Sequence, residues 1–236
     1  HLPPQVHVII ITRADPGLPL SRLRARGQLV ELRAGDLRFT VEESAAYLND
    51  AHDLHLDPAA VAVLDRRTEG WAAAVHLAAL SLRGRADPAG FISAFAGDDR
   101  FVLDYLADEV LGRVPEGTRR FLLETSILDR LTGALCDAVT GASGGKAMLE
   151  ALERQNLFLI PLDDHRRWYR YHHLFADVLK AHLLDERRAD LPQLHRRASD
   201  WFAEQDDPEP AVHHALAARD IGRAAELVEL AVPRLR

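Results

Sequence analysis

The chain has 236 residues, of which 47% are hydrophobic and 28% are charged, and its formal net charge is −7 at pH 7. This length suits one large domain or about two small ones. The negative charge argues against a freestanding nucleic-acid binder, because such proteins usually carry a basic surplus. The single cysteine, Cys136, excludes an internal disulfide, and no apolar run is long enough to span a membrane. Cys136 lies among apolar residues and is interpreted as a buried small side chain rather than a nucleophile.

The first part of the chain is typical of an α/β domain. The segment 5–12, QVHVIIIT, is an apolar, β-branched run that predicts a buried strand of a parallel sheet. The run 28–32, QLVEL, is a candidate neighbouring strand, and 20–26 is a short helix at best.

Helical patterns begin at Thr40. Thr40 and Glu43 have the spacing of a capping box, and Asp57-Pro58 offers an N-cap followed by proline in the first turn. Alanine and leucine dominate the segments that follow, and both are good helix formers. The patterns predict helices over 40–51, 57–66, 69–82, a short segment from 87, 98–111, 115–125, 131–139 and 146–155.

The periodicity then changes to that of a β-hairpin. The apolar run 157–162 and the aromatic run 168–171 are separated by a polar turn, and a helix is expected over 172–184. Helices followed by a hairpin and a last helix are the order of a winged-helix module. From Leu191 the pattern is one of helix pairs, at 191–205, 208–218 and 221–231, which resembles the start of a helical-repeat, TPR-like region.

Two short motifs are candidate ligand sites. Arg13 follows the first expected strand, where an arginine can reach a terminal phosphate, although a surface loop arginine is the more ordinary interpretation. Gly70 permits close backbone approach to a ligand, and Trp71 offers a flat apolar face and one N–H donor. Taken alone, this motif is more often a core tryptophan beside a glycine needed for packing.

Histidines form a third candidate. His172 and His173 stand at an expected helix start, which is suited to meeting an anion. Because adjacent side chains project in different directions, they do not form an i,i+4 metal pair, and zinc binding is rejected. His213 and His214 are also adjacent and are expected on the surface.

Other sequence features favour ordinary interpretations. The segment 141–147, GASGGKA, looks like a phosphate loop but has Thr140 where the Walker A pattern needs glycine and Ala147 where it needs Ser or Thr. It is interpreted as a loop and helix start. Three wing arginines could touch a phosphate backbone, but a solvated wing is favoured by the acidic total; they are Arg166, Arg167 and Arg170.

Several motifs together resemble one family. The segment 11–20, ITRADPGLPL, resembles the sensor I segment of STAND ATPases, and 68–71, TEGW, with 77–82, LAALSL, resembles the glycine motif of their helical domain. The segment 169–177, YRYHHLFAD, resembles the part of the winged helix that carries a conserved histidine. Over essentially its whole length the chain resembles the MalT-like, LuxR-type transcriptional regulators of the STAND P-loop ATPase family.

The resemblance implies a mainly α fold with four parts. Residues 1–38 would be the C-terminal part of a nucleotide-binding α/β domain, and 39–112 a helical lid domain. Residues 113–188 would be a winged-helix domain, and 189–236 the start of the helical repeats. It also implies that Arg13 lies near the terminal phosphate of a nucleotide and that Gly70 and Trp71 line the adenine side. His172 would contact the β-phosphate of ADP and lock the resting state, with His173 as the rival.

The resemblance further implies that the chain is an interior segment of a cytoplasmic switch protein. The Walker A and B elements and the LuxR-type DNA-binding domain would lie elsewhere in the parent, which would bind ADP or ATP with Mg²⁺. From this segment alone we expect no ATPase activity, weak or absent nucleotide binding, and no direct contact with DNA or membrane. Its partners would be the P-loop core, the downstream repeats and the DNA-binding domain of its own chain, further copies when active, and a small-molecule or protein inducer.

Two alternatives remain beside the switch. The first is a helical and winged-helix interaction scaffold with no nucleotide role. The second is a DNA-binding winged-helix protein in its own right, which the net charge disfavours.

Overall fold

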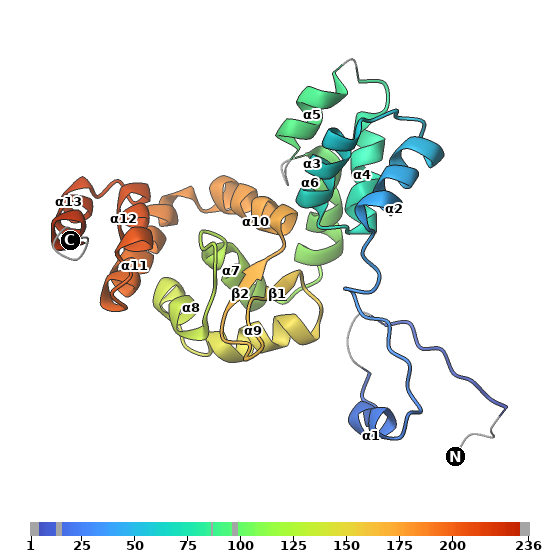
Figure 1. The fold of residues 1–236 in the computed structure, drawn as a ribbon. Coiled ribbons are helices and arrows are strands. Elements are labelled where there is room, and N and C mark those ends of the chain that lie inside the picture. Colours follow the sequence, from blue (N-terminus) through green and yellow to red (C-terminus); the bar gives the residue numbers. More distant parts are fainter. Residues whose placement is uncertain (1–4, 13–15, 86, 96–98, 232–236) are drawn as a thin grey trace.

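The computed structural model describes residues 5–12, 16–85, 87–95 and 99–231. Within the described part of 1–38, regular structure is limited to helix α1 (Leu20–Ala25). The prediction of strands at 5–12 and 28–32 was wrong for this chain: neither run belongs to a sheet among the described residues, and Ile9 and Ile11 are 87% and 96% exposed. A strand needs a hydrogen-bonded neighbour for its backbone groups, and the rest of the described chain supplies none. In Figure 1 this segment extends away from the helical body, and its assignment to an α/β domain stays a prediction.

The next part, called here the helical unit, contains short helices packed around an apolar centre. Their bounds are α2 (Val41–Ala46), the π-helical turn η1 (Tyr47–Ala51), α3 (Pro58–Thr68), α4 (Ala72–Leu82), α5 (Pro88–Ala94), α6 (Arg100–Leu106) and the π-helical turn η2 (Ala107–Leu111). The capping box is confirmed: the Glu43 N–H donates to Thr40 Oγ1 (3.2 Å), and the Thr40 N–H donates to Glu43 Oε2 (2.9 Å). Helix α4 starts three residues later than expected because Glu69 and Gly70 adopt left-handed backbone conformations.

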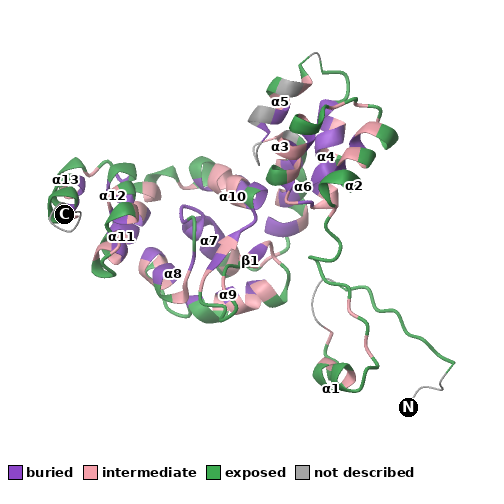
Figure 2. Cartoon of the chain, in the orientation of Figure 1, coloured by how far each residue is buried: buried purple, intermediate pink, exposed green. Residues whose placement is uncertain are grey.

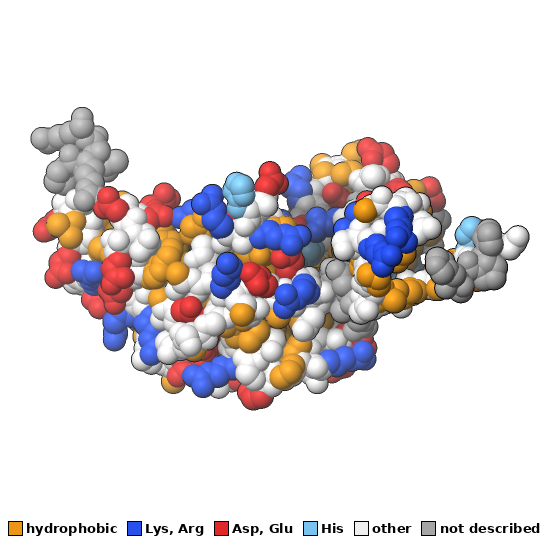
Figure 3. Space-filling model, turned by 90° about the horizontal axis from the view of Figure 1, so that it is seen from below, with side chains coloured by type: hydrophobic (Ala, Val, Ile, Leu, Met, Phe, Trp, Pro, Cys, Tyr) orange, Lys and Arg blue, Asp and Glu red, His pale blue; other side chains and the backbone are white. Residues whose placement is uncertain are grey.

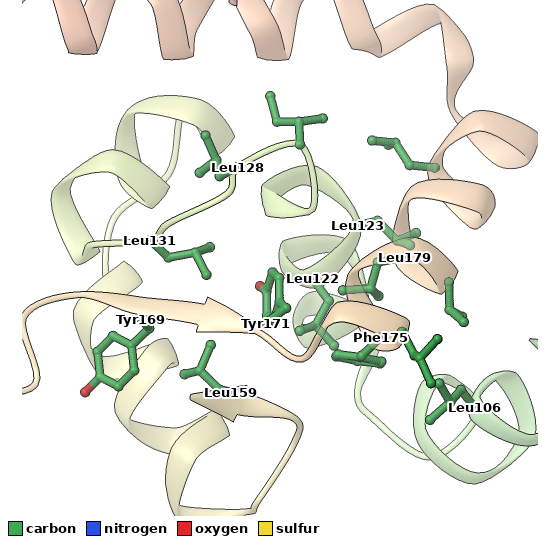
Figure 4. Packing of buried hydrophobic residues seen from close by; sticks show 14 of the residues in the cluster. Leu106, Leu122, Leu123, Leu128, Leu131, Leu159, Tyr169, Tyr171, Phe175 and Leu179 are labelled. Carbon is green, nitrogen blue, oxygen red and sulfur yellow. The ribbon is translucent and has the colours of Figure 1, made fainter. Parts of the chain in front are cut away.

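The winged helix follows in the expected order. Its elements are α7 (Glu116–Thr125), α8 (Gly133–Thr140), α9 (Gly145–Arg154), β1 (Leu159–Pro161), β2 (Tyr169–Tyr171) and α10 (His173–Glu186). The hairpin is confirmed, with β1 antiparallel to β2 and Leu159 opposite Tyr171. Tyr171, Phe175 and Leu122 meet in its core (Figure 4). The glycine-rich segment 141–147 is a loop and helix start, as expected, and the Gly145 N–H donates to Asp137 Oδ1 (2.7 Å).

The last part begins a stack of helices. After a short 3-10 turn, η3 (Arg188–Asp190), come α11 (Leu191–Glu204), α12 (Pro208–Ala217) and α13 (Ile221–Ala231). Helix α12 packs against both α11 and α13, and α11 also packs against α8 of the winged helix. In Figure 2 the buried residues follow the inner faces of these helices, whereas most of the N-terminal segment is exposed.

One expectation for α12 was wrong. His213 is exposed as predicted, but His214 is buried, with 4% of its surface exposed. Residues 211, 214, 215 and 218 share the helix face that packs on α11, because they follow the i, i+3, i+4, i+7 spacing. The His214 ring stacks on Phe202, with the ring planes 8° apart. Adjacent histidines on a helix therefore lie in different surroundings.

No helix in the described ranges is both long enough and apolar enough to cross a membrane.

Candidate functional site

His172 stands at the junction between the winged helix and the helical unit. It is the N-cap residue of α10, directly after β2, and 4% of its surface is exposed. Its Nε2 lies 2.9 Å from the carbonyl oxygen of Thr68, the last residue of α3. Because a carbonyl oxygen only accepts hydrogen bonds, Nε2 carries the proton. In the neutral ring Nδ1 is then a lone-pair acceptor, and it has no hydrogen-bond partner among the described residues.

The protonation state of His172 follows from its burial. Burial lowers the pKa of His172 below its ordinary value of 6.5, while the Glu69 carboxylate and the hydrogen bond to Thr68 act in the opposite direction. The positive charges of Arg38 and of a protonated His173 add to the lowering. The imidazole is therefore neutral near pH 7. As a neutral ring with a bonded Nε2–H, it acts here as a structural hydrogen-bond donor.

Glu69 forms the second contact across the junction. Its two carboxylate oxygens accept hydrogen bonds from Arg170, at 2.8 Å from Nη1 and 2.9 Å from Nη2. The backbone N–H of His173, the first residue of α10, donates to Glu69 Oε1 (3.1 Å). Burial alone would raise the pKa of Glu69, but the hydrogen bonds and charges around it lower that pKa to about 2. The carboxylate therefore stays charged throughout the physiological range.

The prediction of a solvated wing was wrong for Arg170, which contacts Glu69 of the helical unit. Tyr169 and Tyr171 point from β2 into the core, so the intervening Arg170 faces the opposite side, where Glu69 lies. Arg166 fits the expected solvated wing better, since 68% of its side chain is exposed beside Glu153. On the face in Figure 3, basic and acidic side chains are interspersed rather than gathered in one basic stripe.

Gly70 is required by the chain's own backbone. Its φ is +67°, and a Cβ built there would lie 2.3 Å from the carbonyl oxygen of Phe39. The Phe39 N–H donates to the Gly70 carbonyl (2.7 Å), so these two segments approach too closely for any side chain. The close approach suggested by the glycine thus occurs toward Phe39.

Trp71 lies among aromatic rings of both parts. Its ring centroid is 4.8 Å from that of Phe158, 5.9 Å from that of His172 and 5.9 Å from that of Tyr105. Phe158 and His172 belong to the winged helix, whereas Tyr105 belongs to α6 of the helical unit. The ring is therefore part of the packing that joins the two units, and its contact with an adenine base stays a prediction.

The structure thus brings together three of the predicted site residues, Gly70, Trp71 and His172. His173 is adjacent, with 57% of its side chain exposed and its Nδ1 3.1 Å from Glu69 Oε1. Arg13 lies outside the described residues. The sequence analysis did not predict the ion pair between Glu69 and Arg170. Side chains alternate in direction along a strand, so the tyrosines on either side of Arg170 could have indicated that Arg170 points away from the core.

The polar donor groups at the junction are bonded within the chain rather than free to meet a nucleotide. The donors nearest His172 are engaged within the chain: Nε2 with Thr68, and the Arg170 guanidinium with Glu69. In the neutral ring the Nδ1 lone pair cannot donate to a phosphate oxygen, so a phosphate contact requires either that Nδ1 gains a proton or that Nε2 leaves the Thr68 carbonyl. Metal binding has no support among the described residues, which contain no group of three or more His, Cys, Asp or Glu that could hold an ion.

Two hollows lie on the surface of the described part of the chain. A shallow groove of about 500 Å³ follows α2 and η1 and is lined by residues that include Phe39 and Tyr47. Another, of about 250 Å³, borders the glycine-rich loop 141–145 and Arg120. Neither of these two is lined by Gly70, Trp71 or His172; the 4% exposure of His172 and its ring contact with Trp71 show that these two residues are packed against each other.

Comparison with known proteins places this arrangement in a family context. The family model of the MalT winged helix domain matches residues 107–191. The serine/threonine-protein kinase PknK of Mycobacterium tuberculosis (strain ATCC 25618 / H37Rv) is 42% identical over 224 residues, which are 95% of this chain and 20% of that protein. The HTH-type transcriptional regulator MalT of Klebsiella pneumoniae is 38% identical over 222 residues, which are 93% of this chain and 25% of that protein.

The chain therefore spans about a fifth to a quarter of the length of these relatives. The resemblance to MalT-like proteins is confirmed, and so is a mainly helical fold with a two-stranded hairpin. Residues 107–191 are a MalT-type winged helix domain, and nearly the whole chain is homologous to a region that MalT regulators and PknK kinases share.

Proposed function

We propose that this chain is the regulatory lid and lock segment of a signal-responsive STAND-type ATPase that activates transcription. Residues 39–112 act as the helical lid and 113–188 as the winged-helix lock. They lie between the end of a nucleotide-binding domain, at 1–38, and the start of helical repeats, at 189–236. The observation that carries the proposal is the meeting of Gly70, Trp71 and His172 at one junction, although about a hundred residues separate the first two from the third.

His172 is the element of the switch that changes partner. In the arrangement described above, its Nε2–H bonds to the Thr68 carbonyl. In the nucleotide-bound resting state, the same donor would turn to a phosphate oxygen of ADP, which the longer protein binds together with Mg²⁺. Because a ligand shifts such an equilibrium only by its differential affinity, ADP favours the arrangement in which His172 faces it. Arg13 would serve the terminal phosphate, and Gly70 and Trp71 the adenine side.

Opening of the lid and lock would then be linked to assembly. ATP and an inducer sensed by the helical repeats would favour the open arrangement, which frees surfaces for self-association. The longer protein would bring its DNA-binding domains together in this way. This part of the proposal rests on homology to MalT, which is an HTH-type transcriptional regulator.

A second candidate function is a helical and winged-helix scaffold that binds a protein partner without nucleotide. One observation favours it: the polar groups expected to face nucleotide are paired within the chain, with Thr68 for His172 and Glu69 for Arg170. Homology to a protein kinase as well as to a transcriptional regulator also fits a region used in different contexts.

ADP retention by the longer parent protein separates the two candidates. Isothermal titration calorimetry with ADP would compare the wild type with His172→Ala, the rival His173→Ala, and His165→Ala on the exposed hairpin turn as a control. The switch predicts that His172→Ala weakens ADP binding about tenfold or more, the loss expected for one hydrogen bond to a charged group, while His165→Ala has no effect. Unchanged binding in the His172 and His173 variants, or no ADP binding by the wild type, would favour the scaffold.

A further inference from the structure

Glu69 adopts the left-handed backbone conformation that ends α3. Its φ is +51° and its ψ is +35°, in the left-handed region, and Gly70 follows with φ +67°. Non-glycine residues other than Asn and Asp are uncommon in this region, because Cβ comes close to backbone atoms there. Glutamate has no conformational advantage at this position. Seven other non-glycine residues in the described part of the chain also have positive φ, so what distinguishes Glu69 is the set of contacts that its carboxylate makes.

The donors around the Glu69 carboxylate come mainly from the winged helix. Arg170 binds both oxygens, the His173 N–H binds Oε1, and the His173 ring Nδ1 lies 3.1 Å from Oε1. From the helical side, Arg38 Nη1 lies 3.7 Å from Oε2. Only 8% of the Glu69 side chain is exposed, so this ion pair is little screened by solvent. A bidentate arginine fork also sets direction, which a single charge contact does not.

The ion pair and the His172 contact form one unit. Thr68 and Glu69 are adjacent in sequence, and Arg170 and His172 are two positions apart. The hydrogen bonds from Arg170 to Glu69 and from His172 to Thr68 therefore join the same two short segments, at sequence separations of 101 and 104. When Arg170 is bound to Glu69, His172 is therefore placed opposite the Thr68 carbonyl.

We propose that Glu69 and Arg170 are positioning residues that latch the helical unit to the winged helix and hold His172 against the Thr68 carbonyl. The consequence, release of His172 toward nucleotide when the latch opens, rests on the proposed function. The latch itself is tested in this chain without nucleotide, so its failure is distinguishable from failure of the proposed function.

The test is the titration of His172, followed by NMR of the ring nitrogens and assigned by comparison with His172→Gln. Glu69→Gln removes a negative charge that raises the pKa of His172, whereas burial lowers it. If the junction stays closed without the charge, the pKa of His172 falls further. If the junction opens, the ring gains solvent and its pKa rises toward 6.5. The sign of the shift separates a latch from a mere electrostatic neighbour.

We expect an upward shift in Glu69→Gln, with loss of the protected Nε2–H signal. In Arg170→Gln we expect the same loss of signal, which is the decisive observation there because removing a positive charge raises the pKa of His172 by itself. The double variant should shift no further than the larger single variant, because both changes open one contact. The matched control is Glu186→Gln, which removes an ion pair with Arg119 (2.5 Å) inside the winged helix and should leave His172 unchanged. A lower or unchanged pKa of His172 with a retained Nε2–H signal in Glu69→Gln would overturn the latch.

Circular dichroism establishes that each variant is folded. Should Glu69→Gln fail to fold, Arg170→Lys decides by the same measurement, since it keeps the charge and removes the bidentate fork. The latch predicts a smaller upward shift for that variant than for Arg170→Gln. No shift in Arg170→Lys would show that the fork geometry does not position His172.

Discussion

His195 and His214 share a hydrogen bond between their Nδ1 atoms, 2.8 Å apart, where α11 packs on α12. One ring must donate and the other accept, so the pair is held in complementary neutral tautomers. Burial, followed by the positive charges of nearby groups, lowers the pKa of His195 to about 4 and that of His214 to about 3. Protonation of His195 would add most to the lowering at His214, and His213 and Lys180 add to the lowering at both histidines.

We expect the stack of α11, α12 and α13 to lose stability in mild acid. Both histidines have folded-state pKa values below the unfolded value of 6.5, so the unfolded state binds more protons as the pH falls. The stability is fully present above pH 6.5 and is lost progressively toward pH 4 and 3. Between pH 7 and 5, His214 should account for about 2 kcal/mol of lost unfolding free energy.

Urea denaturation at pH 7 and pH 5 measures this loss. The variant His195→Gln/His214→Gln should show a smaller difference between the two pH values than the wild type. His165→Gln is the control, because this exposed histidine on the hairpin turn is not among the groups that shift the pKa of either member of the pair. Equal pH sensitivity in the wild type and the double variant would contradict the assignment.

Gly70→Ala should destabilise the chain strongly. The new Cβ would combine a left-handed backbone conformation with a contact of 2.3 Å to the Phe39 carbonyl oxygen. Gly84 is a matched control, because its φ is +72° but nothing lies within 4 Å of its Cβ position. Gly84→Ala should cost about 1 kcal/mol for the conformation alone, and Gly70→Ala should cost about 2 to 4 kcal/mol. Similar thermal unfolding midpoints for the two variants would show that the approach to Phe39 can relax freely.

The buried pair Thr125 and Tyr171 should respond unequally to removal of either hydroxyl. Thr125 Oγ1 lies 2.7 Å from the Phe121 carbonyl, to which it donates, and 2.7 Å from Tyr171 Oη, from which it therefore accepts. Thr125→Val leaves the Tyr171 hydroxyl without its acceptor and should cost about 1 to 3 kcal/mol. Tyr171→Phe leaves Thr125 bonded to Phe121 and should cost about 1 kcal/mol or less. Chemical denaturation of the two variants gives the comparison, and a larger loss in Tyr171→Phe would reverse the assigned donor.

Cys136 should be unreactive in the native chain. Its side chain is fully buried, and burial, followed by the charge of Asp137, raises the pKa of its thiol. Because the thiolate is the reactive form, a thiol reagent such as DTNB at pH 8 should label the residue only in denaturant. Rapid labelling of folded protein would indicate local opening of α8.

Local signals explain how much of the fold could be predicted from the sequence. The Thr40–Glu43 capping box and the Asp57-Pro58 start depend on atoms within one turn of helix, so their short-range geometry is present in the sequence itself. The hairpin is equally local, since its turn is closed by Asp163, whose carboxylate accepts the N–H groups of His165 and Trp168. The apolar run 5–12 shows the limit of such signals, because a strand also needs a partner that a local pattern cannot supply.

The candidate site was predicted only in part for the same reason. The motifs predict Gly70, Trp71 and His172 as site residues, but a motif does not show which residues contact it in the folded chain. The sequence by itself determined which segments are helical, the hairpin and the positions of these motifs, because these depend on contacts within a few residues. Only the tertiary structure decided that His172 meets Thr68, that Arg170 meets Glu69 and that His214 is buried. Those contacts join segments far apart in the chain, and they form because packing of whole helices, rather than local propensity, brings the segments together.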